Sequence, residues 1–300
     1  MLPAMLFVPG DDEGKLAKVA VLPAPAFILD LEDAVAVSAK AGARENVART
    51  LRASGAGRRI WVRVNSADSG LLPGDLDAVV VPGLEGIVLP KAQRAEDVSE
   101  LTAAVAEREG ARGLEPGSVG LAATIETALG LSGLAGIARA SNRLRFLCFG
   151  AGDLSLDLGL NWTPDSGVAN PTLVAAKVRL VIESRAAGLA PPHDGSFPYL
   201  DRPTQLRAEA LYARSLGFGG KHAIHPGQLP VIRDAFRPTE AEVATAREQL
   251  LAFEAAERAG TARINVGGTF IDYPVAERAR QVIATAETWA RSLWHPRRPP

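Results

Sequence analysis

The order of apolar and helical segments constrains the fold of this chain more than any other feature. Short apolar runs alternate with longer segments of helical spacing, and this alternation indicates βαβ units around a parallel sheet. Eight such units over about 225 residues predict a closed (β/α)8 barrel, the TIM-barrel fold. The eight strands are expected at 5–8, 26–29, 60–64, 86–89, 119–124, 144–149, weakly near Leu189, and at 221–224.

An open doubly wound sheet is the rival architecture. It would require a glycine-rich phosphate turn after the first strand, and "FVPGDDEGK" lacks the GxGxxG pattern. We therefore predict one barrel domain over residues 1–237. Among the helices expected between its strands are 38–52, 95–109, 170–187 and 203–216.

The chain changes character after Pro238. A charged amphipathic helix is expected at 239–259, where Thr239 and Glu242 have the spacing of a capping box. The pair Gly267-Gly268 predicts a hairpin turn, and a final helix is expected at 276–294. We expect residues 238–300 to form a C-terminal extension that acts as a lid or an oligomerisation arm.

Charge and cysteine content narrow the class of protein. The 33 basic and 34 acidic residues give a net charge of −1, so we expect no nucleic-acid partner. A single cysteine, Cys148, excludes an internal disulfide and is expected to be a buried small hydrophobe. No apolar run reaches membrane-spanning length, and the N-terminus lacks the pattern of a secretory signal. These features predict a cytoplasmic protein without a membrane partner.

Ionisable side chains follow six of the expected strands. Because barrel active sites lie at the carboxyl ends of the strands, we expect these side chains to share one rim. They are Asp30, Glu32 and Asp33 after the second strand, Arg63 in the third, Lys91 after the fourth, Glu126 after the fifth, Asp153 after the sixth, and His225 after the eighth.

Several of these residues also have a structural explanation. Asp153 could cap a short helix at 154–158, and Glu126 could be a first-turn acid favoured by the helix dipole. Lys91 could be a salt-bridged rim residue, and His225 could only stabilise a loop. The set as a whole favours function, because scattered surface charge would not select one rim.

The rim acids suggest a particular chemistry. Glu126 and Asp153 on adjacent strands suit a hard cation that keeps several waters, which means Mg²⁺ or Mn²⁺. Arg63 could bind a carboxylate with its planar fork. A divalent cation beside an arginine suits a 2-oxo or 2-hydroxy acid, whose C–O bond the cation polarises. A Schiff-base aldolase using Lys91 is less favoured but stays open.

At these residues the sequence resembles the citrate lyase β-subunit/malyl-CoA lyase (HpcH/HpaI aldolase/citrate lyase) family. The shared motifs occur in order over about residues 6–283. They are "LFVPG", "ILDLEDAV", "VRVN", "LPKAQ", "IETALGL", "FGAGDLSLDLG" and "AIHPGQ". The resemblance implies a TIM barrel with a C-terminal extension. It also implies an Mg²⁺ enzyme that cleaves or forms a C–C bond in a 3-hydroxyacyl thioester.

The resemblance also implies roles for rim residues. Glu126 of "IET" and Asp153 of "FGAGD" would be the metal ligands, with Asp157 structural or acting through water. Arg63 would bind substrate and offset negative charge on the reacting oxygens. Glu32 and Asp33 of "LEDAV" would order the metal's waters.

Two further roles lie outside the rim. Lys18 would approach the phosphates of CoA. Asp272 of "FIDYP" would reach an active site from a lid, usually that of a neighbouring subunit, and transfer a proton at the thioester α-carbon. The arm implies a homo-oligomer, a homotrimer or homohexamer.

We therefore predict a lyase that releases a 2-oxo acid and an acyl-CoA from a citryl-, malyl- or citramalyl-type thioester. The acyl group stays open, because "PAM" before "LFVPG", Gly152 before Asp153 and the loop "PPHDGSFP" depart from the family's pattern. Two alternatives stay open as well. One is a metal-dependent aldolase on free 2-oxo acids, and the other is the β-subunit of a citrate lyase complex that acts on carrier-bound acyl groups.

Overall fold

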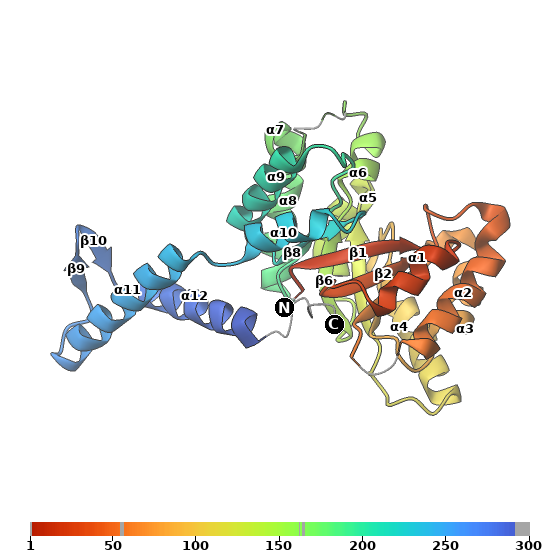
Figure 1. Ribbon diagram of the computed structural model, residues 1–300, viewed down its shortest axis with the longest axis horizontal. Helices are drawn as coiled ribbons and strands as arrows, with labels where there is room; N and C mark the ends of the chain where they lie inside the picture. Colours follow the sequence, from red (N-terminus) through yellow and green to blue (C-terminus); the bar gives the residue numbers. More distant parts are fainter. Residues whose placement is uncertain (1, 55–56, 162, 164–165, 292–300) are drawn as a thin grey trace. The chain divides into compact units, whose positions relative to one another are not determined.

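The computed structural model describes residues 2–54, 57–161, 163 and 166–291 (Figure 1). It divides the chain into two compact units, Leu2–Phe236 and a C-terminal unit that begins at Arg237. The predicted domain boundary follows residue 237, one residue beyond the end of the first unit.

A closed barrel of eight parallel strands forms the first unit within the described residues, which confirms the predicted TIM-barrel fold. Each strand pairs with the next in sequence, and β8 pairs with β1, where Met5 lies opposite His222. The strands are β1 Ala4–Pro9, β2 Ala26–Asp30, β3 Ile60–Arg63, β4 Gly86–Leu89, β5 Gly120–Ile125, β6 Leu144–Phe149, β7 His193–Asp194 and β8 Gly220–Ala223.

Apolar side chains from alternate strand positions fill the barrel, as the two-residue period of a strand dictates. Met5, Ile28, Trp61, Phe146 and Cys148 belong to this inner cluster. Cys148 is fully buried, and burial raises the pKa of its thiol well above the ordinary range. The prediction that this cysteine is a small buried hydrophobe is therefore confirmed.

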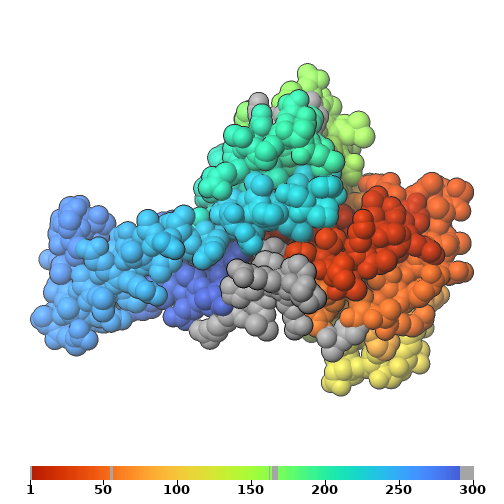
Figure 2. All heavy atoms as spheres, viewed as in Figure 1, coloured from red at the N-terminus to blue at the C-terminus, as the bar shows by residue number. Residues whose placement is uncertain are grey.

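Helices surround the barrel and follow the predicted segments within a few residues. The helices α1, α2 and α3 pack in sequence, and Figure 2 shows this region (red to orange) as one continuous surface. The helices of this unit are α1 Glu13–Ala17, η1 Lys18–Ala20, η2 Val37–Ala39, α2 Lys40–Ala53, η3 Ala67–Ser69, α3 Leu72–Val79, α4 Ala95–Ala111, α5 Ala128–Ile137, α6 Ala151–Asp157, α7 Ser166–Ala169, α8 Pro171–Ala186, α9 Pro203–Leu216 and α10 Gln228–Phe236.

The seventh strand is where the sequence prediction was wrong. It was expected near Leu189, but the backbone N–H of Leu189 donates to Ser184, so Leu189 belongs to the end of α8. The strand β7 is His193–Asp194 instead, and its two residues are polar. A search for apolar runs could not reveal this strand, because its buried residue Asp194 forms ion pairs with Lys177 and Lys221 instead of apolar contacts.

The C-terminal unit pairs two long helices with a small hairpin. Its elements are α11 Glu240–Arg258, β9 Ile264–Val266, β10 Thr269–Ile271 and α12 Tyr273–Arg291. Thr239 and Glu242 form the predicted capping box. Gly267 and Gly268 both have positive φ, as the predicted two-residue hairpin turn requires. Phe253, which is fully buried, packs with the end of the hairpin and the start of α12. The last residues of the predicted final helix, 292–294, lie outside the described residues.

The helices α11 and α12 have 19 residues each and carry charged side chains along their length. Among the residues that the structure describes, no helix combines the length and the apolar character needed to cross a membrane.

Candidate active site

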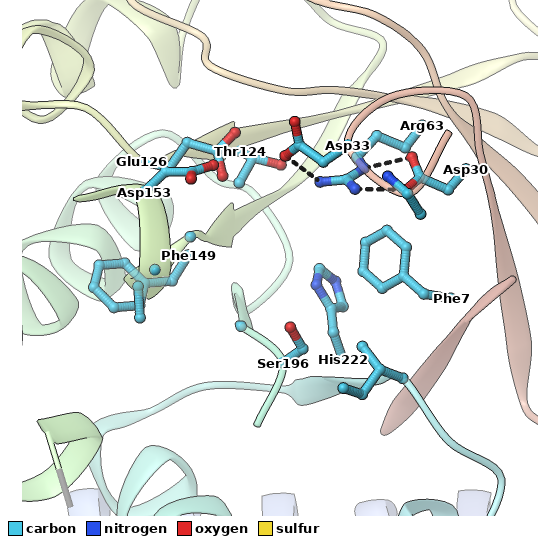
Figure 3. Close-up of a pocket in the computed structure, with 16 residues that line it drawn as sticks. Phe7, Asp30, Asp33, Arg63, Thr124, Glu126, Phe149, Asp153, Ser196 and His222 are labelled. Carbon is cyan, nitrogen blue, oxygen red and sulfur yellow. Dashed lines mark hydrogen bonds and ion pairs between the residues drawn. The ribbon is translucent and has the colours of Figure 1, made fainter. Parts of the chain in front are cut away.

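A cavity of about 290 Å³ opens at the carboxyl ends of the barrel strands (Figure 3). Parallel strands present these ends at one rim, so residues far apart in sequence meet there. The ionisable residues Asp30, Asp33, Arg63, Glu126, Asp153 and His222 line it. The structure thus brings together five of the residues predicted for the rim, which are Asp30, Asp33, Arg63, Glu126 and Asp153.

Glu126 and Asp153 form a pair of carboxylates on one wall of the cavity (Figure 3). Glu126 follows β5 directly, is buried, and accepts a hydrogen bond of 2.8 Å from the backbone N–H of Lys91. Burial, together with the charges of Asp153 and Glu32, raises the pKa of Glu126 to about 8. The crowding of negative charge disfavours ionisation of Glu126 and favours a cation between the two carboxylates.

The structural alternatives for these two acids are not borne out. The helix α6 begins at Ala151 and its N-cap is Gly150, so Asp153 lies inside the first turn rather than at the cap. The N-cap of α5 is Thr127, so Glu126 precedes that helix. A Cβ at position 150 would lie 2.2 Å from Glu126 Oε2, and only glycine permits this approach.

The donor set fits a hard divalent cation. Glu126 and Asp153 offer only carboxylate oxygens, and a cation such as Mg²⁺ takes one or two carboxylates and keeps several waters. Across the described part of the chain, no group of three or more His, Cys, Asp or Glu side chains is arranged to hold a metal. A fully protein-ligated zinc site is therefore absent from the described residues.

Arg63 is held in the cavity by a fork of hydrogen bonds (Figure 3). Its Nε and Nη2 donate to the two oxygens of Asp30 at 2.7 and 2.6 Å, and Nη1 lies 3.0 Å from Glu32 Oε2. Burial would lower the pKa of Arg63, but the bonds and charges of Asp30 and Glu32 outweigh burial and raise it. Asp30 uses two of the five N–H donors of the guanidinium, so three are left for Glu32 and a bound carboxylate.

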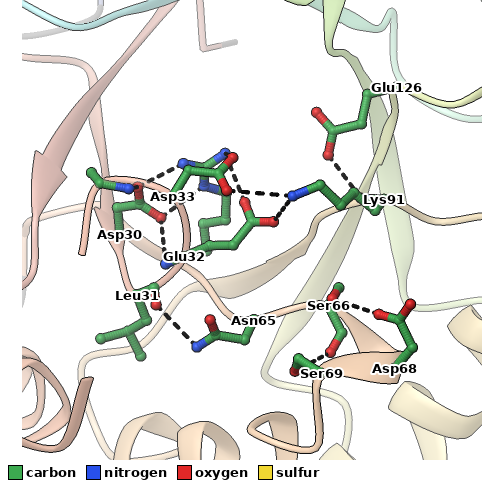
Figure 4. A network of polar contacts seen from close by, with 12 residues as sticks. Asp30, Leu31, Glu32, Asp33, Asn65, Ser66, Asp68, Ser69, Lys91 and Glu126 are labelled. Carbon is green, nitrogen blue, oxygen red and sulfur yellow. Dashed lines mark hydrogen bonds and ion pairs between the residues drawn. The ribbon is translucent and has the colours of Figure 1, made fainter. Parts of the chain in front are cut away.

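Glu32 is not among the residues that line the cavity, and it joins two cations (Figure 4). Its oxygens contact Arg63 Nη1 at 3.0 Å and Lys91 Nζ at 2.6 Å, and the residue is 5% exposed. Burial raises the pKa of Glu32 despite both cations. Asp33 is half-exposed and makes longer contacts, 3.4 Å to Lys91 and 3.7 Å to Arg63. Of the two acids predicted to order water, Asp33 therefore reaches the cavity and Glu32 braces the basic residues.

Lys91 is the non-glycine residue with positive φ (48°) among the described residues, a conformation that costs backbone energy. The bond from its N–H to Glu126 and the bond from its Nζ to Glu32 hold it there. Burial would lower the pKa of Lys91, but Glu32 and Asp33 raise it. A Schiff-base lysine must lose its proton readily, so Lys91 is suited to the salt-bridged role.

Four sequence-predicted residues are not among those that line this cavity. Lys18 is exposed at the start of η1. His225 is exposed and accepts a hydrogen bond from the N–H of Gly227, which makes it a loop-stabilising residue. Asp157 accepts from the N–H of Ala128 at 2.6 Å. Asp272 lies in the C-terminal unit and accepts from the N–H of Val275 in the first turn of α12.

Sequence reasoning missed several cavity residues. Phe7, Thr124, Ser196 and His222 line it alongside the acids. His222 follows Lys221 in β8 and therefore faces the opposite side of the sheet. The alternation of side chains along a strand could have indicated that one of Lys221 and His222 faces the barrel interior. Because both residues are polar, the sequence did not show which one. Burial, followed by the nearby His193 and Lys221, lowers the pKa of His222 well below its ordinary value, so its imidazole is neutral.

Known proteins share this architecture and sequence. The family model described as HpcH/HpaI aldolase/citrate lyase matches residues 3–226. The chain is 36% identical over 286 residues to the citrate lyase subunit beta of Escherichia coli, covering 95% of this chain and 93% of that protein. It is 35% identical over 288 residues to the (3S)-malyl-CoA thioesterase of Cereibacter sphaeroides, covering 96% of this chain and 95% of that protein.

A solved structure agrees with these matches. Protein CitE from Mycobacterium tuberculosis, in complex with magnesium, acetoacetate and coenzyme A, superposes with a TM-score of 0.79 at 30% identity. The match covers 95% of this chain and 98% of that chain. On the family model and the identities together, this chain belongs to the HpcH/HpaI aldolase/citrate lyase family, a family of lyases.

Proposed function

We propose that this protein is a carbon–carbon lyase that cleaves a 3-hydroxyacyl-CoA thioester of the citryl, malyl or citramalyl type. The products are a 2-oxo acid and an acyl-CoA. The observation that supports this most is the placement of two paired carboxylates and a partly free guanidinium around one barrel-rim cavity. Magnesium and coenzyme A in the similar CitE structure support the same chemistry.

Different rim residues would bind different groups of the substrate. Glu126 and Asp153 would hold Mg²⁺ or Mn²⁺, which when bound supplies a Lewis acid that polarises the C–O bond of the substrate. Arg63 donates N–H groups that Asp30 does not use to the carboxylate of the 2-oxo acid half. Asp30 fixes the plane of the guanidinium, so little side-chain entropy is lost when the substrate binds.

Cleavage moves two protons and two electron pairs, because the O–H pair forms the new C=O bond while the C2–C3 pair forms the enolate. The hydroxyl on C3 loses its proton, the C2–C3 bond breaks, and C3 becomes the carbonyl carbon of the 2-oxo acid. The electron pair of the broken bond goes to C2 and forms the thioester enolate, which is then protonated at C2. We assign the hydroxyl proton to Asp33, because this cavity acid is half-exposed and its contacts with Arg63 and Lys91, at 3.7 and 3.4 Å, are longer than those of Asp30 and Glu32.

The enolate proton and the CoA site are assigned through the family pattern. Asp272 would donate the proton at C2, and Lys18, which is exposed, would contact the CoA phosphates. The C-terminal extension would then act as a lid or an oligomerisation arm. We propose a homotrimer or homohexamer in the cytoplasm, with no nucleic-acid or membrane partner. Light scattering of the purified protein would show a mass three or six times that of the chain.

A second candidate function is the β-subunit of a citrate lyase complex, which would act on carrier-bound acyl groups. The identity of 36% to the citrate lyase subunit beta of Escherichia coli, over almost its whole length, favours this candidate. The chemistry at the cavity would be the same, and only the thioester carrier would differ. Activity on free CoA esters separates the two candidates.

The test is a thioester-cleavage assay with malyl-CoA, citramalyl-CoA and citryl-CoA, detecting the 2-oxo acid released. We expect release from one substrate with Mg²⁺ and none with EDTA. Folded protein that is inactive on all three would contradict the CoA lyase. Activity restored only on acyl groups attached to a carrier protein would favour the second candidate. Cleavage of free 2-oxo acid aldols alone would favour the metal-dependent aldolase.

A further inference from the structure

His222 forms part of the floor of the cavity, opposite the metal-binding carboxylates. Its ring points into the cavity beside Phe7 and Ser196 (Figure 3). It is 4% exposed, and its ring packs edge-on against Phe7 at 5.3 Å and against His193 at 5.7 Å between ring centroids. The side chain is therefore held firmly in place by the interior of the barrel.

The imidazole of His222 has an unused hydrogen-bonding capacity. Its Nε2 is buried and has no hydrogen-bond partner among the described residues. A buried polar atom without a partner is destabilising, and a bound ligand or water can supply the missing partner. The neighbouring His193 stacks on Phe146 with 4.5 Å between ring centroids, and it contacts His222 by ring packing and not by a hydrogen bond.

The chemistry of the substrate indicates which group reaches this floor. The thioester carries the bulk of CoA and must leave through the open mouth of the cavity. The carboxylate and the oxygen on C3 face Arg63 and the acidic wall. The remaining substituent on C3 then points to the buried floor, and it is carboxymethyl in citryl, methyl in citramalyl and hydrogen in malyl thioesters.

We propose that His222, assisted by the hydroxyl of Ser196, is a specificity-determining residue that hydrogen-bonds an oxygen of the C3 substituent. This inference rests on the proposed lyase function. A floor with an unpaired imidazole favours a substituent that carries a hydrogen-bonding oxygen, because a methyl group would leave the imidazole unpaired. The floor therefore selects a carboxymethyl arm over a methyl group or hydrogen.

The experiment measures kcat/KM on citryl-CoA and citramalyl-CoA, which differ only in this substituent. Wild type, His222→Leu, His222→Gln and the control His225→Leu are compared, with folding checked by circular dichroism. His225 is an exposed histidine three residues along the chain that does not line the cavity. We expect wild type to prefer citryl-CoA by at least about 10-fold, the effect of one buried hydrogen bond.

In His222→Leu the preference should disappear through loss of citryl-CoA turnover while citramalyl-CoA turnover is kept. His222→Gln should retain the preference within about 3-fold, since its amide keeps a donor and an acceptor, and His225→Leu should not change it.

Three results would overturn this inference but not the proposed function. They are a wild-type preference for citramalyl-CoA, an unchanged ratio in His222→Leu, and an equal loss on both substrates. If His222→Leu fails to fold, a His222→Gln variant that prefers citramalyl-CoA would overturn it. Inactivity of wild type on all the thioesters would instead overturn the proposed function.

Discussion

Two charged networks lie in the same barrel and differ in how their charges balance. The rim network consists of Asp30, Glu32, Asp33, Arg63, Lys91, Glu126 and Asp153. The outer network behind β7 and β8 consists of Lys177, Asp194, Glu209 and Lys221. The rim network has five acids against two bases, whereas the outer network has two of each.

The difference separates a structural network from one that is arranged for a ligand. Asp194 contacts Lys177 at 3.0 Å and Lys221 at 2.7 Å, and all three side chains are at most 1% exposed. The charges of the outer network are therefore balanced within the fold. The rim network leaves Glu126 and Asp153 without a cation of their own beside an open cavity. Surplus charge of one sign in a cavity predicts a ligand of the opposite sign.

The largest expected effect is on the stability of the outer network. Asp194→Asn removes the anion shared by two buried lysines, and breaking a buried ion pair costs about 3–5 kcal/mol. We expect urea unfolding to show a loss of this size. A change below about 1 kcal/mol would mean that the lysines find other partners and that the network is not structural.

The matching substitution at the rim should affect activity and spare the fold. Asp153→Asn removes one of two carboxylates that would hold the cation, so Mg²⁺-dependent cleavage should fall by at least about 10³-fold, or about 4 kcal/mol. The midpoint of thermal unfolding should stay close to that of wild type, in contrast to Asp194→Asn. Unchanged turnover of the Asp153→Asn protein would remove this residue from the metal site.

Asp272→Ala tests the acid outside the barrel. If Asp272 protonates the enolate, its loss should lower kcat by about 10²- to 10³-fold, the usual contribution of a general acid. Binding of Mg²⁺ and of the 2-oxo acid, measured by calorimetry, should be unchanged. Exposed Asp201→Ala serves as the control. Full turnover in Asp272→Ala would leave the C-terminal extension with a structural role only.

Arg63→Lys keeps the charge of the rim network and loses the planar fork. One charge-assisted hydrogen bond is worth about 1.5–3 kcal/mol, so kcat/KM should fall by about 10- to 150-fold. Steady-state kinetics on the preferred thioester gives the value. A near-normal kcat/KM would mean that Arg63 only neutralises Asp30 and Glu32.

The smallest expected effect is the acid response of the outer network. Burial would raise the pKa of Asp194, but Lys177 and Lys221 outweigh it and lower the pKa from 3.8 to about 2. A folded-state pKa below the unfolded value stabilises the protein above pH 3.8, and this contribution is lost as pH falls towards 2. Urea unfolding at pH 5, 4 and 3 should show a decline of about 1 kcal/mol in all, most of it between pH 4 and pH 3, that is weaker in Asp194→Asn. Parallel declines in the two proteins would place the acid sensitivity elsewhere.

Most of the barrel could be predicted from the sequence alone. Seven strands were predicted within a residue or two, and most of them are apolar runs, which reveal strands that bury both faces. The exception, β7, is held by ion pairs of Asp194 rather than by apolar contacts, so its pattern was invisible. The capping box at Thr239 and the turn at Gly267-Gly268 were also predicted, since both depend on local backbone chemistry.

The sequence determined the fold, the rim on which the acids would meet, and the family motifs that contain Glu126 and Asp153. Only the tertiary structure decided how these side chains are used. It showed that Asp30 occupies the fork of Arg63, that Glu32 pairs with Lys91, and that His222 lines the cavity. The physical reason is that strand and helix patterns depend on near neighbours in the chain. Ion pairs and an unpaired buried imidazole depend on residues that closure of the barrel brings together.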